Sequence, residues 1–262
     1  MKRRHLHLFA AALAGTCVLP LAARAGGLPE LIDKVRPGVV LVGTHAETDN
    51  PRFTFRGTGF AVGDGRHVIT NVHVLPEALS TSLDDPARRR LSLRFSPRRG
   101  LWQELEAVEV VATDRERDLA LLRFKGPALP ALELADPAEA REGLPVILSG
   151  FPLGGALGFS LVTHRGMVSA LTTIALPPPQ SQQLNAAALR RLREGAFEIL
   201  QLDATAYPGN SGGPVISQDS GKVVGVVNMV FVKGSRETAL SQPSGISYAI
   251  PVSWVHQLMG AR

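Results

Sequence analysis

The stretch Gly209-Asn210-Ser211-Gly212-Gly213-Pro214 decides the interpretation of this chain, because it places a serine in a turn with glycines on both sides. A serine hydroxyl is a poor nucleophile unless a base lies within hydrogen-bond reach, and acyl transfer also needs donors aimed at the developing oxyanion. Glycines let the backbone adopt unusual angles and approach a substrate closely, while Pro214 stiffens the exit from the turn. Taken alone, the stretch is more often an ordinary turn.

Two apolar runs upstream supply the partners that such a serine needs. The run Ile69–Val74 delivers His73, and the run Asp118–Leu122 opens on an aspartate. The chain order His73, Asp118, Ser211 is that of the chymotrypsin-type triad and differs from the orders in α/β-hydrolases and subtilisins. The order therefore favours the chymotrypsin-type fold over the folds of the α/β-hydrolases and the subtilisins.

Six stretches occur together along the chain: Gly57–Phe60, Ile69–Val74, Asp118–Leu122, Ser149–Gly154, Pro208–Pro214 and Gly245–Pro251. Through them the chain resembles the protease domain of the HtrA (Deg) serine proteases, over nearly all of the residues that follow the N-terminal segment. The resemblance implies an all-β, chymotrypsin-like fold. Two orthogonal six-stranded β-barrels would hold the catalytic residues in the cleft between them.

The resemblance also implies a role for each residue of the site. His73 would take the proton of Ser211 as general base and return it to the leaving amine, and Asp118 would orient His73. The backbone N–H groups of Gly209 and Ser211 would form the oxyanion hole. A buried histidine at the end of a strand is the alternative for His73, and Asp114 is a nearby competitor for the aspartate.

Five residues are expected by position near the primary specificity pocket: Ala206, Tyr207, Val227, Asn228 and Ile246. None of them is acidic, so the pocket would take a small or medium apolar side chain rather than Lys or Arg. The segment Val226–Met229 would pair with the main chain of the substrate. Plain barrel core is the alternative for all of these residues.

Residues 1–25 have the pattern of a secretory signal peptide. A basic start precedes an apolar stretch from Leu6 to Leu21, and Ala23–Ala25 forms a small-x-small cleavage site. An uncleaved membrane anchor is the alternative, although the stretch is short and contains Pro20. The single cysteine, Cys17, would leave with the signal peptide. We expect a periplasmic or secreted protein without disulfides and without stable membrane insertion.

The charge balance argues against a polyanionic partner. Removal of the signal peptide takes four basic residues and no acidic one, which lowers the formal net charge from +5 to +1. The remaining arginine clusters lack interleaved aromatic residues, so no nucleic-acid binding is expected. The sequence contains no metal-ligand cluster, phosphate-cradling loop or cofactor fingerprint, and we expect no metal and no cofactor.

Strand signals divide the remaining chain into two halves. We expect an N-terminal β-barrel over 26–125, a linker rich in Pro and Ala over 126–144, and a C-terminal β-barrel over 145–262. The polar segment 176–195 interrupts the rhythm of strands and predicts a short helical insertion in the second barrel. It is either a surface decoration or a regulatory loop.

These features predict a secreted or periplasmic serine endopeptidase that cleaves unfolded or exposed polypeptides, with a role in protein quality control implied by the resemblance. A chaperone-like or peptide-binding module with a latent site is the alternative, and an esterase with the same triad is a third hypothesis. HtrA proteins typically continue into PDZ domains, for which the residues after Val255 are too few. We expect the protease domain alone, with a homotrimer possible by resemblance.

Overall fold

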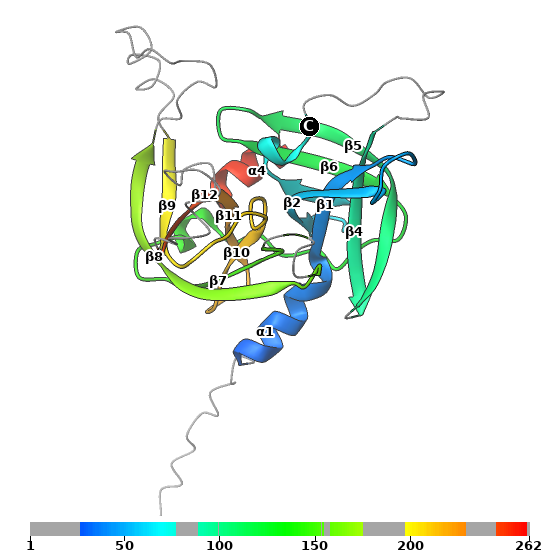
Figure 1. Ribbon diagram of the computed structural model, residues 1–262. Helices are drawn as coiled ribbons and strands as arrows, with labels where there is room; N and C mark the ends of the chain where they lie inside the picture. The colour runs from blue at the N-terminus through cyan, green and yellow to red at the C-terminus, as the bar shows by residue number, and fades with distance from the viewer. Residues whose placement is uncertain are drawn as a thin grey trace, which may run out of the picture.

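The computed structural model describes residues 27–76, 89–98, 100–152, 154, 158–174, 197–228 and 245–260. The expected signal peptide at 1–25 and the expected helical insertion at 176–195 lie outside these residues, as does Met229. The described part of the chain forms two β-barrels with short helices around them (Figure 1).

Six antiparallel strands close the first barrel in the order β1-β2-β3-β6-β5-β4. They are β1 (Val39–His45), β2 (Phe53–Val62), β3 (His67–Thr70), β4 (Arg90–Arg98), β5 (Leu101–Asp114) and β6 (Leu119–Lys125). Strand β1 is buried along its whole length, because one of its faces fills the barrel and the other packs against neighbouring elements. Its first four residues, Val39–Val42, accordingly form a continuous apolar run instead of alternating with polar residues.

Six further antiparallel strands close the second barrel in the order β10-β11-β12-β9-β8-β7. They are β7 (Pro145–Gly150), β8 (Val162–Ile174), β9 (Phe197–Asp203), β10 (Pro214–Ser217), β11 (Val223–Asn228) and β12 (Ile246–Pro251). The prediction of an all-β fold with two six-stranded barrels is therefore confirmed. The strands end and begin on either side of 126–144, at Lys125 and Pro145.

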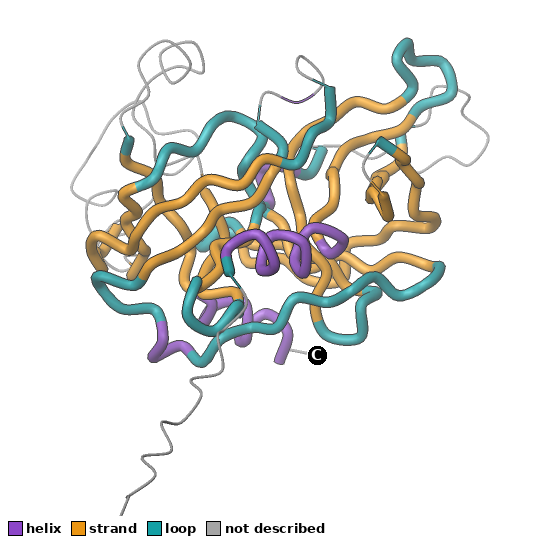
Figure 2. Tube along the Cα trace, turned by 90° about the horizontal axis from the view of Figure 1, so that it is seen from below, coloured by secondary structure: helices purple, strands orange, loops and turns teal. Residues whose placement is uncertain are grey.

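The helices among the described residues are short (Figure 2). They are α1 (Leu28–Val35), η1 (Arg36–Gly38), η2 (Val72–Val74), η3 (Pro137–Glu139) and α4 (Val252–Gly260). Leu28, Leu31, Ile32 and Val35 recur at helical spacing in α1, which gives the helix one apolar face. Within the described residues, no helix has both the length and the apolar composition that crossing a membrane requires.

An apolar cluster between the barrels fixes their relative positions. It joins Phe60 and Leu121 of the first barrel to Ile147 and Val226 of the second, and helix α4 contributes Val255. Burial of each large apolar side chain contributes roughly 1.5–3 kcal/mol, so this shared cluster strongly opposes sliding of one barrel against the other. A site built across the two barrels is thereby held in register.

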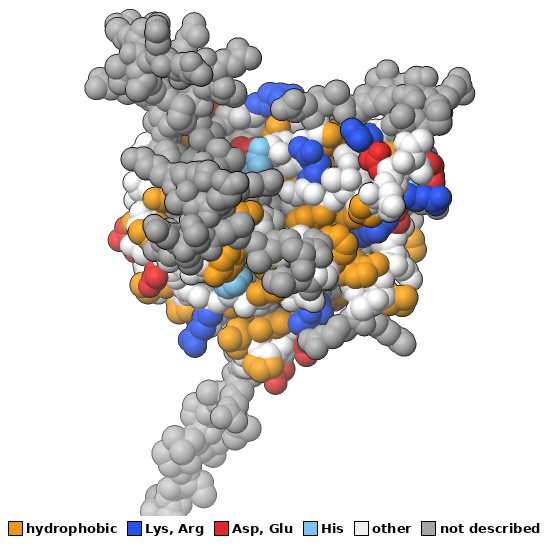
Figure 3. Space-filling view, viewed as in Figure 1, with side chains coloured by type: hydrophobic (Ala, Val, Ile, Leu, Met, Phe, Trp, Pro, Cys, Tyr) orange, Lys and Arg blue, Asp and Glu red, His pale blue; other side chains and the backbone are white. Residues whose placement is uncertain are grey.

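Charged side chains of both signs are interspersed on the face seen in the space-filling view, with hydrophobic side chains between them (Figure 3). The described part of that face carries no stripe of a single sign. Exposed ion pairs such as Arg89–Asp49 and Arg123–Glu109 contribute little to stability.

Candidate active site

Asp118 lies in the tight turn between β5 and β6, immediately before Leu119, with a left-handed φ of +56°. Asp adopts this conformation more readily than most residues, yet it still costs about 1–3 kcal/mol. Two hydrogen bonds to the backbone carbonyl of Asp118 offset this cost. The Asp118 carbonyl accepts from the Asn71 side-chain amide at 2.9 Å and from the Val72 backbone N–H at 3.3 Å.

The Asp118 carboxylate accepts three hydrogen bonds in a site that leaves the residue only 8% exposed. Oδ1 accepts from the backbone N–H of His73 at 2.9 Å, and Oδ2 accepts from its ring Nδ1 at 2.5 Å. Oδ2 also accepts from the side-chain amide of Asn228 at 2.8 Å. A carboxylate so surrounded by donors is held in one orientation.

His73 lies in the single turn η2, where β3 ends and the chain leaves the first barrel. Because a carboxylate can only accept, Nδ1 carries the proton in this contact, which leaves a lone pair on Nε2 of the neutral ring. The side chain is 34% exposed. Arg56 holds the end of the turn by donating to the carbonyls of Val74 and Leu75 at 2.6 and 3.0 Å.

Ser211 lies in a turn of the second barrel that docks onto β2 of the first. The Ser211 carbonyl accepts from the Thr58 backbone N–H at 2.9 Å, and the Thr58 hydroxyl donates to the Gly209 carbonyl at 2.7 Å. A side chain on Gly212 would overlap the Thr58 carbonyl and the Thr70 hydroxyl, and would lie 3.2 Å from the backbone nitrogen of Asn71. The serine turn thus packs directly on the residues that lead to His73.

Two backbone donors in this turn are available to a ligand. The N–H groups of Asn210, Gly212 and Gly213 are satisfied by carbonyls of the turn and of β11. Within the described residues, the N–H groups of Gly209 and Ser211 donate to no protein acceptor. Gly209 has a φ of +104°, a conformation that glycine adopts without strain.

Of the three expected catalytic residues, two are in direct contact and the third lies in a turn beside them. His73 and Asp118 are in direct contact, and the Ser211 turn packs beside them from the other barrel. In the described part of the chain, no hydrogen bond connects the Ser211 hydroxyl to the His73 ring. Asp114, the competitor, pairs instead with Arg117 at 2.8 Å.

The five expected pocket residues have different surroundings. Ala206 and Val227 are buried, Ile246 is exposed, and the ring of Tyr207 lies 5.8 Å from that of His164. Asn228 is fully buried and donates to Asp118, which the sequence interpretation missed. The available signal was Asn228 itself, a polar residue at the end of the otherwise apolar strand β11. This signal does not reveal a partner in the other barrel.

His164 of β8 borders the same turn through its contact with Tyr207. Burial of the imidazole lowers its pKa from the usual value of 6.5, because the charged form is disfavoured away from water. Its Nε2 atom is buried without a hydrogen-bond partner. The residue therefore has both an electrostatic and a hydrogen-bonding reason to resist protonation.

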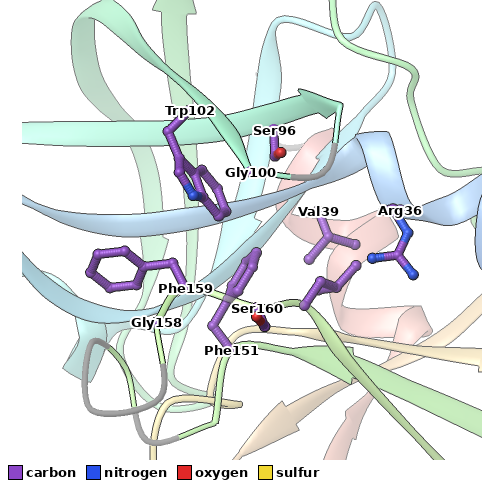
Figure 4. A pocket seen from close by; sticks show the side chains of 10 residues that line it. Arg36, Val39, Ser96, Gly100, Trp102, Phe151, Gly158, Phe159 and Ser160 are labelled. Carbon is purple, nitrogen blue, oxygen red and sulfur yellow. The ribbon is translucent and has the colours of Figure 1, made fainter.

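A cavity of about 450 Å³ lies beside the first barrel, between Trp102, Phe151 and Phe159 (Figure 4). None of the five expected pocket residues is among the residues that line it. Its wall still connects to the serine turn, because the Phe151 N–H donates to the Thr58 hydroxyl at 3.1 Å. Among the described residues, no group of three His, Cys, Asp or Glu side chains is arranged to hold a metal ion.

Known proteins resemble this chain in sequence and in fold. A probable periplasmic serine endoprotease DegP-like of Pseudomonas putida is 30% identical over 197 residues, which is 75% of this chain and 34% of that protein. The corresponding protein of Halomonas elongata is 29% identical over 198 residues, covering 75% and 32%. The chain thus spans about a third of the length of these relatives.

A solved structure of a variant of the HtrA-type protease AlgW with a tripeptide has the same fold. It superposes with a TM-score of 0.58 at 22% identity, over 89% of this chain and 62% of the other. The predicted resemblance to HtrA proteases is confirmed by these matches. The family model described as a trypsin-like peptidase domain matches residues 57–226, and the chain belongs to that family.

Proposed function

We propose that this chain is a serine endopeptidase of the cell envelope that cleaves peptide bonds in unfolded or exposed polypeptides. The observation that carries the proposal is the Asp118 carboxylate, which holds both the backbone and the ring Nδ1 of His73 beside the turn of Ser211. The similar proteins of Pseudomonas putida and Halomonas elongata are described as probable periplasmic serine endoproteases.

In the proposed mechanism His73 acts as general base. Asp118 fixes the tautomer that leaves the Nε2 lone pair available for the Ser211 proton, and it stabilises the imidazolium that forms. Ser211 Oγ then attacks the scissile carbonyl, and His73 returns the proton to the leaving amine. Water cleaves the acyl-enzyme with His73 again as base.

The oxyanion of each tetrahedral intermediate would be bound by the N–H groups of Gly209 and Ser211. Both donors are free within the described residues, and they belong to a turn that Thr58 anchors from the first barrel. Donors that are fixed before the reaction need no reorganisation when charge develops, which makes each of them worth about 2.7–4 kcal/mol.

Substrate preference and location extend the proposal. Ile246 offers an exposed apolar side chain and Ala206 is a small apolar residue at 7% exposure, which suits a small or medium apolar residue before the cut, whereas Val227 is fully buried in the barrel core. The signal-peptide pattern of residues 1–25 and the periplasmic relatives support export to the envelope. A role in protein quality control would follow from preference for unfolded chains.

The proposal is tested by casein cleavage with the purified protein, its Ser211→Ala variant and a Ser160→Ala control at an exposed serine. We expect cleavage by the wild type and the control, none by Ser211→Ala, and mass-spectrometric product ends with small or medium apolar residues before the cuts. Equal cleavage by Ser211→Ala would contradict the proposal.

A latent, peptide-binding form is the second candidate. It is favoured by one observation, which is that no hydrogen bond joins the Ser211 hydroxyl to His73 in the described residues. Catalytic hydrogen bonds are often long before substrate binds, so this geometry is also that of a resting enzyme. Binding of unfolded casein without cleavage, and without reaction with a fluorophosphonate, would favour the latent form.

A further inference from the structure

Arg117 immediately precedes Asp118 in the turn between β5 and β6, and it fastens that turn from within. Its backbone N–H donates to Asp114 Oδ1 at 3.0 Å, and its Nη1 donates to Asp114 Oδ2 at 2.8 Å. The two bonds close a compact loop that ends on the left-handed Asp118. The position of Arg117 therefore bears directly on the conformation of its neighbour.

The same side chain also reaches the second barrel. The guanidinium carbon of Arg117 lies 3.7 Å from the ring centroid of Trp254 in α4 and 6.0 Å from that of Phe197, the first residue of β9. The two rings meet edge to face, with centroids 6.4 Å apart and planes at 86°. They form a corner of the second barrel in which the guanidinium lies over the indole.

The contact between Arg117 and Trp254 contributes enough free energy to restrain the Asp118 turn. The Arg117 side chain is 23% exposed, and its Nε is buried without a hydrogen-bond partner. A cation over an aromatic face contributes about 0.5–1 kcal/mol when exposed and about 2 kcal/mol when desolvated. A planar guanidinium can stack on an aromatic face, whereas a lysine ammonium keeps only the charge, so arginine suits this site better than lysine.

Helix α4 is itself firmly placed. Val255 and Leu258 pack in the apolar cluster between the barrels, and the His256 ring nitrogen Nε2 lies 2.9 Å from the Ala135 carbonyl. Trp254 therefore presents a fixed surface to Arg117. The Asp118 turn is held from the second barrel at two points, by Trp254 behind it and by Asn228 on its carboxylate.

We propose that Arg117 is a positioning residue for catalysis, which docks the Asp118 turn on Trp254 so that the carboxylate keeps both of its contacts with His73. The inference rests on the proposed function. It makes helix α4, which is remote in sequence from Asp118, a support of the catalytic carboxylate. The Arg117 side chain acts through Asp118 and needs no contact with substrate.

The first test compares Arg117→Met, Arg117→Lys and the exposed control Arg115→Met of the same turn. In a chromogenic peptide assay, Arg117→Met is expected to lower kcat about tenfold to a hundredfold, because small displacements of a catalytic group are costly. KM should stay within about twofold, since substrate contacts are intact. Arg117→Lys should recover part of kcat, and Arg115→Met should match the wild type.

The second test reads the hydrogen bond itself and approaches the contact from the other side. The far-downfield proton resonance of the His73–Asp118 bond is expected to shift or broaden in Arg117→Met and Trp254→Leu, and to persist in Trp254→Phe, which keeps an aromatic face. Thermal unfolding identifies the folded variants. This resonance would not respond to a residue that served stability alone.

Wild-type kcat and an unchanged resonance in folded Arg117→Met and Trp254→Leu would overturn the inference, as would a rise in KM alone. If Arg117→Met does not fold, Trp254→Leu against Trp254→Phe decides the question by the same two readouts. Loss of activity in Ser211→Ala, measured in parallel, shows that the proposed function stands even where the role of Arg117 fails.

Discussion

At the scale of single residues, the site depends on how one carboxylate is shared. Asp118 serves His73 in its own barrel and Asn228 in the other, and both bonds reach the same oxygen, Oδ2. A second donor on that oxygen limits rotation of the carboxylate and prevents it from turning away from the imidazole. Residues on opposite barrels thus fix the orientation of His73, the proposed general base.

Replacing Asp118 by Asn should reduce kcat by about four orders of magnitude, because an amide nitrogen in place of Oδ2 would favour the wrong tautomer of His73. The shape of the residue is preserved, so the thermal unfolding temperature should change far less than kcat. Steady-state kinetics and a melting curve of the same preparation test this pair of outcomes. Wild-type kcat in Asp118→Asn would remove Asp118 from the proposed mechanism.

Replacing Asn228 by Ala should lower kcat about tenfold to a hundredfold, since a hydrogen bond to a charged group contributes about 1.5–3 kcal/mol. Asn228→Ser, which retains a donor, should lose less. Peptide hydrolysis by the two variants gives the comparison. Equal activity of Asn228→Ala and the wild type would assign Asn228 to the barrel core alone.

At the scale of elements, the serine turn is fitted to β2 and β3 with no spare volume. Gly212 has a φ of +83° and faces Thr58 and Thr70, whereas Gly100 in the turn between β4 and β5 has the same φ with nothing nearby. Alanine substitutions at the two glycines therefore distinguish the cost of a left-handed backbone from the cost of a steric clash.

Gly100→Ala should destabilise the protein by about 1–2 kcal/mol, the cost of placing a side chain in the left-handed region, and leave activity intact. Gly212→Ala should destabilise it more and abolish activity, because Thr58 or the turn must move. Chemical denaturation and peptide hydrolysis measure the two effects. Similar losses in both variants would show that the close packing of the serine turn is unimportant.

His164 of β8 contacts the serine turn through Tyr207, and its burial should make the stability of the protein depend on pH. Because the pKa of His164 is lowered in the folded state, the unfolded chain binds the proton more tightly, and stability must fall as the pH drops below the ordinary value of 6.5. His164→Gln should therefore lose less stability than the wild type between about pH 7.5 and about pH 5.5. Identical shifts of the melting temperature in the two proteins over that range would show that His164 does not cause the loss of stability.

At the scale of the whole molecule, the proposed catalytic groups come from both barrels, and the contacts between the barrels keep them together. His73 and Asp118 belong to the first barrel, while Ser211 and Asn228 belong to the second. The apolar cluster, Thr58 and the Arg117–Trp254 stack all cross the same boundary. Activity should therefore respond to changes in barrel docking before global unfolding.

The strand runs and the order of the expected triad could be predicted from local signals, and the resemblance to the HtrA proteases implied the two barrels. The sequence did not reveal the partner of Asn228, which lies 110 residues from Asp118, or the hydroxyl of Thr58 beneath Gly209. The stack of Arg117 on Trp254 was missed for the same reason. Such contacts depend on how two closed barrels dock, and no periodicity in either half records that.

Ser211 is proposed to be an activated nucleophile, and labelling with a fluorophosphonate followed by peptide mass spectrometry tests this role. The account predicts one adduct on the peptide containing Ser211, reduced labelling in Asp118→Asn, and none in Ser211→Ala. A folded protein that remains unlabelled, or that carries the adduct on another serine, would contradict the account.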